Sequence, residues 1–336
     1  MENNNCIYNS IDCVIGNTPM VYLNKITKHL DAKIAVKLEY FSPSCSVKDR
    51  ASIAMIDQYE RDGIIIPGKS ILIEATSGNA GIGLAFVSAV RNYKLILVMP
   101  DSVSLERKCL VKAYGAELIL TEASKGMKGV FERVEEIKKS VPNVVDVNQF
   151  GNQSNPLVHY QTTGPEIYRQ CEGNIDMACF GVGTGGTCTG ISKYLKEKNR
   201  KIKVFAVEPY ESSILSGMDV GSHKIQGIGI GMVPRNLDLT YVDDIIRVKS
   251  NDAIEMSRRL AKEEGILCGI SSGANVCAAI QLACKEENSG KLIVTTVASF
   301  GERYLSTELF SDIKNESSSM TFTTIEEDIE RFKNIF

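Results

Sequence analysis

The sequence of 336 residues lacks several features that would assign it to a functional class at once. Its ten cysteines include no CxxC pair and no cysteine–histidine spacing typical of a zinc site, so we expect no metal site. The formal net charge of −3 gives no reason to expect nucleic acid or an anionic membrane as a partner. No apolar run approaches the roughly 20 residues that a membrane-spanning helix needs.

Targeting signals and low-complexity segments are also missing. Residues 1–10 show neither an apolar core nor an arginine-rich amphipathic pattern, so we expect no signal or transit peptide. Several cysteines lie inside apolar runs such as residues 177–180, where a free thiol behaves as a small buried hydrophobic group. These observations predict a reducing compartment, and we expect a cytoplasmic protein.

The sequence does contain a regular alternation of short apolar runs and helical patterns. The runs are rich in Val, Ile and Leu and are continuously apolar, as expected of strands buried on both faces. The predicted strands are residues 34–40, 70–75, 94–99, 117–121, 144–148, 177–182, 203–207, 243–248 and 291–297. The predicted helices are residues 47–62, 78–92, 105–114, 125–139, 156–171, 186–199, 251–264 and 273–285. Strand–helix–strand alternation predicts an α/β fold with parallel sheets and right-handed crossovers.

This many strand–helix units favour two sheets over one. We predict two doubly wound, mostly parallel α/β domains, a smaller one over residues 42–152 and a larger one. The larger domain would combine residues 153–308 with the N-terminal segment 8–41. Residues 309–336 are polar and acidic apart from 320–325, so we predict a C-terminal appendage or flexible tail.

Lys48 lies at the start of the predicted helix 47–62. Pro43 biases the residue before it away from the α conformation, and Ser44 or Ser46 can cap the helix that follows. The positive end of the helix dipole and partial burial both favour a neutral amine over an ammonium ion. Such a lysine can condense with an aldehyde, which is how pyridoxal phosphate is held. On this segment alone, a surface lysine at a helix start is the commoner alternative.

Residues 181–187, Gly-Val-Gly-Thr-Gly-Gly-Thr, follow a predicted strand and open a helix. The closely spaced glycines expose backbone N–H groups, Thr184 and Thr187 add hydroxyls, and the helix start adds positive potential. The segment therefore suits a phosphate. Its glycines also match the dinucleotide fingerprint GxGxxG, and Glu208 stands where an acidic ribose ligand is expected. This loop alone leaves a single-phosphate cofactor and a nicotinamide cofactor equally open.

Two further loops join a strand to a helix. In residues 76–81 the N–H groups and hydroxyls suit a carboxylate, and Asn79 can donate to a phenolic oxygen. A plain turn with glycines for tight packing is the alternative there. In residues 269–273, Ser271 or Ser272 could be an N-cap. Opposite a pyridine nitrogen, however, a hydroxyl does not force that nitrogen to stay protonated, which suits β-elimination.

Residues 63–70 match the Walker A expression letter for letter. A phosphate loop must follow a strand and open a helix, whereas here a helix precedes and a strand follows. Pro67 also has no N–H group to offer a phosphate. We therefore predict an ordinary helix-to-strand turn.

Six motifs in register resemble the cysteine synthase / cystathionine β-synthase family of pyridoxal phosphate enzymes. They are residues 46–50, 74–81, 183–187, 223–229, 269–273 and 299–306. The resemblance runs from about residue 11 to residue 307 and implies fold type II, the tryptophan synthase β-like fold, with the cofactor in a cleft between the domains. The segments most similar to the eukaryotic cysteine synthase-like and β-cyanoalanine synthase branch are residues 49–56, 104–107, 159–165 and 298–302.

The resemblance also implies roles for individual residues. Lys48 would hold pyridoxal 5'-phosphate as a Schiff base and act as the acid and base of the reaction. The other implied cofactor-binding residues are Asn79, Gly183, Thr184, Gly185, Gly186, Thr187 and Ser271. The implied substrate-binding residues are Thr76, Ser77, Gly78, Ala80, Gln149 and Gly227.

The implied reaction is β-replacement on a β-substituted alanine. The donor would lose its leaving group from Cβ to give an aminoacrylate, to which a nucleophile adds. O-acetylserine and sulfide would give cysteine, and cysteine and cyanide would give β-cyanoalanine and sulfide. We expect a homodimer.

Ala80 departs from the pattern of the family, which usually has a threonine at this position. The missing hydroxyl would bond the substrate carboxylate, and its loss could cost about 1.5–3 kcal/mol of binding free energy. The departure permits altered substrate choice. It equally permits a catalytically weak or inactive regulatory relative that binds the C-terminal peptide of a partner protein in the cleft.

Overall fold

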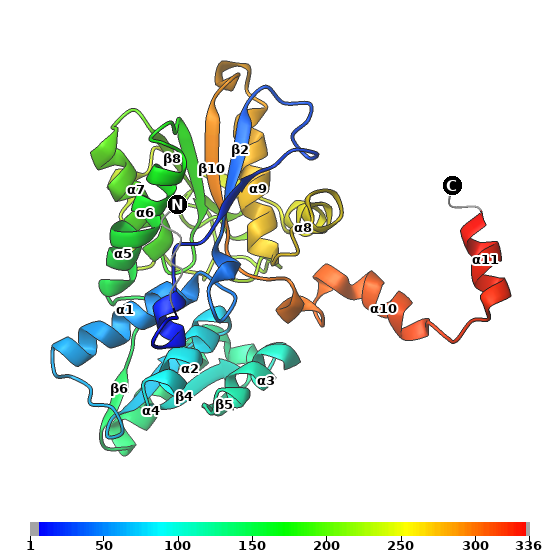
Figure 1. Ribbon diagram of the computed structural model, residues 1–336. Helices are drawn as coiled ribbons and strands as arrows, with labels where there is room; N and C mark the ends of the chain where they lie inside the picture. The colour runs from blue at the N-terminus through cyan, green and yellow to red at the C-terminus, as the bar shows by residue number, and fades with distance from the viewer. Residues whose placement is uncertain (1–6, 334–336) are drawn as a thin grey trace.

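The computed structural model describes residues 7–333 and contains two sheets, the larger above the smaller in Figure 1. The larger sheet has six strands in the order β1-β2-β10-β7-β8-β9, and the smaller has four in the order β5-β4-β3-β6. All neighbouring strands are parallel except β1 and β2. The predicted α/β fold with two mostly parallel sheets is confirmed. Because β2 lies between β1 and β10, the N-terminal segment returns to the larger sheet.

The strands are β1 (Met20–Tyr22), β2 (Lys33–Leu38), β3 (Ile71–Ala75), β4 (Lys94–Pro100), β5 (Glu117–Thr121), β6 (Val144–Asp146), β7 (Met177–Gly181), β8 (Lys203–Pro209), β9 (Asp244–Val248) and β10 (Leu292–Val297). The helices are α1 (Lys48–Arg61), α2 (Asn79–Val90), α3 (Leu105–Ala113), α4 (Gly126–Ser140), α5 (Ser154–Val158), α6 (Gly164–Gln170), α7 (Gly186–Lys198), α8 (Ser250–Glu264), α9 (Ile270–Ala283), α10 (Ser311–Ser319) and α11 (Ile325–Lys333). A π-helical turn, η4 (His159–Thr163), joins α5 to α6.

Every predicted strand is present, and the structure adds the short antiparallel strand β1, which its three residues gave too little pattern to predict. The prediction of one continuous helix over residues 156–171 is wrong. The π-helical turn interrupts this helix just before Gly164 and Pro165. Pro165 has no N–H group to donate to the preceding turn, so a regular α-helix cannot run through this point. Helix α9 begins three residues earlier than predicted, with Gly269 as its N-cap.

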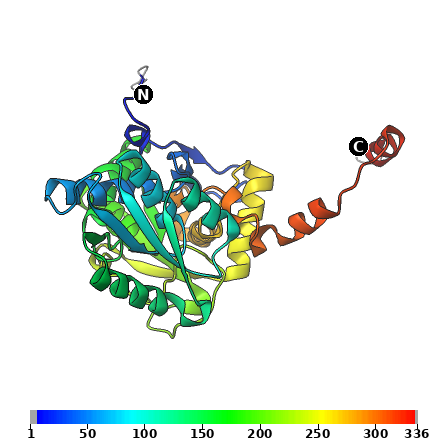
Figure 2. The same ribbon diagram turned by 90° about the horizontal axis from the view of Figure 1, so that it is seen from below.

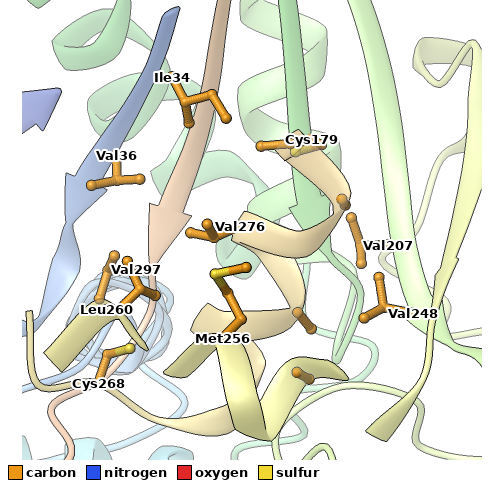
Figure 3. Close-up of a cluster of buried hydrophobic side chains, with 14 of the residues drawn as sticks. Ile34, Val36, Cys179, Val207, Val248, Met256, Leu260, Cys268, Val276 and Val297 are labelled. Carbon is orange, nitrogen blue, oxygen red and sulfur yellow. The ribbon is translucent and has the colours of Figure 1, made fainter. Parts of the chain in front are cut away.

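The inner strands are buried on both faces, as their continuous apolar runs predict, whereas the edge strands β1, β5, β6 and β9 are partly exposed. In the smaller sheet, Leu72 packs toward α1 and α2, whereas its neighbour Ile73 packs toward α4. In the larger sheet, Cys179 faces α8 and α9, and the next residue, Phe180, faces α7. Figure 3 shows the core on the α8 and α9 side, where Val276 lies among side chains from β2, β7 and β10. Burial of both faces makes each sheet a rigid support for the loops at its strand ends.

The first turn of α1 is attached to the larger sheet, although the rest of α1 packs on α2 of the smaller one. The N–H group of Val47 donates to the carbonyl of Ala298 at 2.9 Å, just after β10. Ser46 forms an isolated β-bridge with Ser299, and its Oγ accepts from the Lys48 N–H group at 3.3 Å. The predicted cap is therefore only partly right, since Ser46 contacts the helix start while the N-cap position belongs to Val47.

A buried ion cluster fixes the same helix two residues further along. The Arg50 guanidinium donates to Glu39 at 2.7 Å and to Glu166 at 2.7 Å, and Lys37 Nζ lies 2.7 Å from Glu166. Burial alone would raise the pKa of Glu166, but the hydrogen bonds and the charge of Arg50 hold it at about 2. The cluster pairs two cations with two carboxylates, so no charge in it is left without a partner.

The C-terminal residues extend away from both sheets, as the two views show (Figures 1 and 2). The guanidinium of Arg258 on α8 holds their base by donating to the carbonyl of Leu309 at 2.9 Å and pairing with Asp312 at 3.3 Å. No side chain of α10 or α11 is buried. The predicted C-terminal appendage thus takes the form of two exposed helices.

Within residues 7–333, none of the helices combines the length and apolar character that crossing a bilayer requires. The same residues contain no group of three or more His, Cys, Asp or Glu side chains that could hold a metal ion. Their nine cysteines are all free. The segment in which no leader peptide is expected, residues 1–10, lies partly outside the described residues, and the predicted domain boundaries stay a prediction.

We expect Arg50→Leu to lower the free energy of unfolding by about 3–5 kcal/mol, because two buried carboxylates lose their shared partner. The measurement is urea denaturation at neutral pH. Arg61→Leu, at the exposed end of the same helix, is the control and should change stability by less than about 0.5 kcal/mol. An Arg50→Leu protein as stable as the control would contradict the assignment.

The pH dependence of the wild-type protein provides an independent check on this ion cluster. The pKa of Glu166 is depressed from 4.5 to about 2, so its contribution to stability is complete above pH about 4.5. That contribution is lost as the pH falls toward about 2. We expect this acid-dependent loss to be smaller in Arg50→Leu than in the wild type.

Candidate active site

A cleft of about 380 Å³ is lined by loops from the ends of both sheets. Residues 76–80 follow β3, residues 100–107 follow β4 and residues 149–150 follow β6, whereas residues 183–184 and 223–230 belong to the larger sheet. A narrower cavity leads from it toward Ser271 and shares Lys48, Asn79 and Gly183 with the cleft. Parallel strands of both sheets thus end at one site, as is usual for ligand sites in α/β proteins.

Lys48 lines both the cleft and the narrower cavity. Its ammonium group has no hydrogen bond or ion pair to any other residue in 7–333. Burial lowers the pKa of Lys48 from 10.5 to about 8. At pH 7.5 roughly a quarter of such amines are neutral, compared with about one in a thousand for an ordinary lysine. Lys48 is therefore suited to act as a nucleophile or a base.

The glycines of residues 183–187 are required because neighbouring backbone and side-chain atoms leave no room for a Cβ. A Cβ on Gly183 would lie 2.3 Å from the carbonyl oxygen of Gly227, and a Cβ on Gly186 would lie 2.0 Å from Asn155 Oδ1. Gly185, the N-cap of α7, has a φ of 84°, which side chains rarely adopt. This crowding brings the first turn of α7 against the cavity, where the N–H groups of a helix start suit an anion.

The two threonine hydroxyls of this loop are oriented by residues of α5 and η4. Asn155 Nδ2 donates to Thr184 Oγ1 at 2.9 Å, and His159 Nε2 lies 3.2 Å from Thr187 Oγ1. With its hydrogen on Nε2, His159 donates to Thr187 and can accept from Thr163, whose Oγ1 lies 2.9 Å from Nδ1. Each loop threonine then accepts from the protein and keeps its own O–H group for a ligand.

His159 is neutral in this arrangement. Burial first, and then the positive charges of Arg50 and Lys48, hold the pKa of His159 well below its usual 6.5. A neutral ring has one donor and one acceptor nitrogen, which is what its two threonine neighbours require. His159 therefore contributes hydrogen-bond direction to the loop, not charge.

These features fit a phosphorylated pyridine aldehyde. The loop offers N–H and O–H donors for a phosphate, Lys48 offers an amine, and Ser271 lines the same cavity with its hydroxyl unengaged by the described residues. Asn275 Oδ1, also in the wall of this cavity, is buried without a partner. Asn79 is held by Tyr304 and Arg303, the former accepting from Nδ2 at 3.2 Å, which leaves its second N–H group available.

The predicted substrate loop borders the cleft at the start of α2. Thr76 is buried and its Oγ1 accepts from the N–H group of Gly78 at 3.2 Å, while Ser77 is exposed to the cleft. Ala80 and Gly227 also line the cleft. The structure therefore places the predicted residues of this loop around one space, with an apolar methyl group at position 80.

Gln149 lines the cleft but is already engaged. Its Nε2 donates to Glu74 Oε1 and to the carbonyl of Ala75, both at 3.2 Å. Binding of a substrate carboxylate by this amide would need one of these bonds to break. The roles of all these side chains remain predictions, and the arrangement of the side chains around the cleft supports them.

The chain matches the family described as pyridoxal-phosphate dependent enzyme over residues 11–299. It belongs to this family. Cysteine synthase 3 of Caenorhabditis elegans is 56% identical over 313 residues, 93% of each chain. A cysteine synthase of Staphylococcus aureus is 51% identical over 303 residues, which cover 90% of this chain and 97% of that one.

Solved structures agree with the family assignment. A cysteine synthase of Entamoeba histolytica superposes with a TM-score of 0.88 at 43% identity, covering 96% of this chain and 95% of that chain. A hydrogen sulfide-producing enzyme of Fusobacterium nucleatum superposes with a TM-score of 0.85 at 46% identity, covering 89% and 100%. The fold is that of fold type II pyridoxal phosphate enzymes, as the sequence motifs predicted.

The family membership and the structure together exclude two alternative interpretations, a Walker A loop at residues 63–70 and a nicotinamide-binding loop at residues 181–186. Residues 63–70 form the turn between α1 and β3, as predicted. Glu208, the expected ribose ligand of a nicotinamide enzyme, instead accepts from the N–H groups of Leu215 and Ser216 at 2.8 and 3.0 Å. Its carboxylate holds the loop after β8 and is not available to a ribose.

Four residues of this pyridoxal phosphate site were not predicted from the sequence. Asn155 and His159 support the phosphate loop, and Ser104 and Arg107 lie in the wall of the cleft. Ser104, Arg107 and His159 fall within segments that resemble the family, which was the available signal. Their roles depend on partners far away in the sequence, which no local pattern indicates.

We expect covalent attachment of added pyridoxal phosphate to the apoprotein to accelerate as the pH rises, with a half-maximal rate near pH 8 and a plateau above it. The reason is that only the neutral amine reacts, and the pKa of Lys48 is about 8. Stopped-flow absorbance in the visible range measures the rate at each pH. A half-maximal rate near pH 10.5 would show an ordinary, unperturbed lysine, and Lys48→Ala should show no attachment.

We expect His159→Leu to weaken retention of pyridoxal phosphate by up to about tenfold, because Thr187 loses the donor that orients it. His159→Gln, whose amide nitrogen can replace Nε2, should retain more of the affinity. Equilibrium dialysis followed by cofactor fluorescence measures the dissociation constant. Tyr160→Phe, which removes a hydroxyl bonded to Glu197 at the surface, is the control. Equal affinity in the Leu and Gln variants would refute the orienting role.

Proposed function

We propose that the protein is a pyridoxal phosphate-dependent cysteine synthase that converts O-acetylserine and sulfide into cysteine and acetate. The observation that carries the proposal is the position of Lys48. Its unpaired amine of lowered pKa lies where the phosphate loop of the larger sheet meets the substrate loop of the smaller one. The high identity to cysteine synthases of worm and bacterium supports the same reaction.

The bound cofactor would supply an electron-withdrawing ring that stabilises negative charge at the Cα atom of the donor. Residues 183–187 would hold its phosphate, Asn79 its phenolic oxygen and Ser271 its ring nitrogen. The hydroxyl of Ser271 does not compel protonation of that nitrogen, which favours loss of a Cβ substituent over transamination. Lys48 would be the base that takes the proton from Cα and later returns one.

The start of α2 would bind the carboxylate of the donor. The N–H groups of Asn79 and Ala80 belong to the first turn of that helix and point toward its positive end. With the carboxylate fixed there, the Cα–H bond would be directed at Lys48. Closure of the cleft around the donor would exclude water, which would otherwise compete with sulfide for the Cβ atom.

The methyl group of Ala80 is the observation that keeps a second activity open. Without the hydroxyl that the family usually has there, the carboxylate would be held mainly by backbone N–H groups. Transfer of cyanide to cysteine, giving β-cyanoalanine and sulfide, uses the same residues with a different leaving group and nucleophile. The similar sulfide-producing enzyme of Fusobacterium nucleatum shows that related chains release sulfide.

Ala80 also motivates the regulatory alternative, in which the cleft binds the C-terminal peptide of a partner protein. A peptide carboxylate at the start of α2 would use the same N–H groups as the substrate. The free amine of Lys48 favours the enzyme, because a purely regulatory cleft has no need of a nucleophile.

We further propose a homodimer and a cytoplasmic location, the latter supported by the free cysteines in residues 7–333.

Steady-state assays test the proposal by comparing O-acetylserine with sulfide against cysteine with cyanide. We expect cysteine formation to be the faster reaction and Lys48→Ala to reduce it by at least about a hundredfold. Lys69→Ala, in the exposed turn after α1, is the control and should keep full activity.

The other outcomes assign the alternatives. Faster production of β-cyanoalanine would assign the second activity instead. No turnover with either pair, together with tight binding of a C-terminal peptide, would assign the regulatory role.

A further inference from the structure

Two buried polar side chains that follow β4 in the sequence, Ser104 and Arg107, lie in the wall of the cleft. Arg107 on α3 is only 4% exposed, yet its guanidinium has no hydrogen bond or ion pair to any residue in 7–333. Its Nε is fully buried with no hydrogen-bond partner in residues 7–333. The Oγ of Ser104, one turn earlier, is also buried, and its hydroxyl lies within reach of the Glu106 carboxylate. Both residues line the cleft.

Among the described residues no carboxylate forms an ion pair with Arg107, whose charge acts instead on another cation, Arg303. The guanidinium lies 5.1 Å from the ring centroid of Tyr304, and a Cβ on Gly78 would lie 3.8 Å from its carbon. A buried cation without a carboxylate partner is unfavourable, so a site of this kind is expected to receive an anion or an oxygen acceptor from a ligand. The guanidinium Nε–H and the Ser104 hydroxyl are both donors, which matches such a ligand.

The phosphate of the cofactor does not explain these donors. The loop suited to phosphate follows β7 in the larger sheet, and its threonines line the narrower cavity. Neither Ser104 nor Arg107 lines that cavity. The two donors therefore face the part of the cleft that receives the substrate.

The strand order places these donors next to the loop after β3, where Arg107 approaches Gly78, and away from the residues after β6. Strand β3 lies between β4 and β6 in the smaller sheet. The predicted carboxylate-binding residues follow β3 and β6, whereas Ser104 and Arg107 follow β4 on the other side. A donor bound by its carboxylate between the first two loops would extend its Cβ substituent toward the third.

We propose that Ser104 and Arg107 form a subsite for the oxygen atoms of an acyloxy leaving group on the Cβ atom of the donor. This inference rests on the proposed function and specifies its substrate class. When the Cβ–O bond breaks, its electron pair stays on the oxygen, and acetate leaves as an anion. The proton lost from Cα goes to Lys48. Donors placed where this charge develops lower the barrier to its departure.

The test compares two donors that share the α-carboxylate and differ in the leaving group. O-acetylserine carries an acyloxy group, whereas β-chloroalanine carries a single chlorine atom with no oxygen acceptor. Values of kcat/KM with sulfide are measured for the holoenzyme and for Arg107→Met, Arg107→Lys and Ser104→Ala. Lys108→Met, which removes the next positive charge on α3, is the matched control.

We expect Arg107→Met to reduce kcat/KM for O-acetylserine at least about tenfold more than for β-chloroalanine. Arg107→Lys should recover part of the difference, Ser104→Ala should show a smaller loss of the same kind, and Lys108→Met should show none. An equal loss with both donors would place Arg107 at the carboxylate or in support of its loop, and would overturn the proposal.

The wild-type measurements separate this proposal from the proposed function. A wild-type protein that uses O-acetylserine, together with an equal loss for both donors in Arg107→Met, would overturn the acyloxy subsite alone. A wild-type protein that uses β-chloroalanine but not O-acetylserine would overturn the proposed function and the subsite with it. A wild-type protein that uses neither donor would overturn both. Ser104→Ala removes one oxygen atom, so the proposal stays testable even if Arg107→Met fails to fold.

Discussion

The attachment of the first turn of α1 to the larger sheet is the constraint on which the site depends. Helix α1 packs along the smaller sheet, yet Val47 bonds to the end of β10 and Arg50 is buried between Glu39 and Glu166 of the larger unit. Lys48 lies between these two anchors. Its position is therefore determined by both sheets, although it needs no hydrogen bond of its own. A catalytic amine that is fixed by its backbone keeps its lone pair free.

The same arrangement explains the electrostatics of the cleft. Arg50 is neutralised by buried carboxylates, whereas Lys48 and Arg107 are left without a partner among the described residues. Arg50 therefore has a structural role, whereas Lys48 and Arg107 face the space for a ligand. Asn155 and His159 act differently, because they hold the neutral hydroxyls of Thr184 and Thr187 at the cavity. Positive charge is thus concentrated where the carboxylate of a substrate would bind, and residues 183–187 would need no cationic side chain to hold a phosphate.

The fold and most of the site could be predicted because their signals are local. Continuous apolar runs gave the strands, and each loop with special chemistry follows a strand and opens a helix. The π-helical turn at His159 could not be predicted, since it arises from the packing around Pro165 and α7. Arg107 and Asn155 were missed for a related reason. Their significance lies in what they contact, or do not contact, across the fold, and a single sequence shows neither.

The two motifs that proved misleading show why context decides. The Walker-like residues 63–70 and the GxGxxG glycines have the right letters, but a phosphate site needs N–H groups directed from a helix start at the carboxyl end of a strand. The first motif has no such helix. The second has one, and the crowding of Gly183 and Gly186 against the backbone and Asn155 shows why glycine is needed there. The same letters therefore suit a single phosphate here better than a dinucleotide, because Glu208 is already committed to the loop behind it.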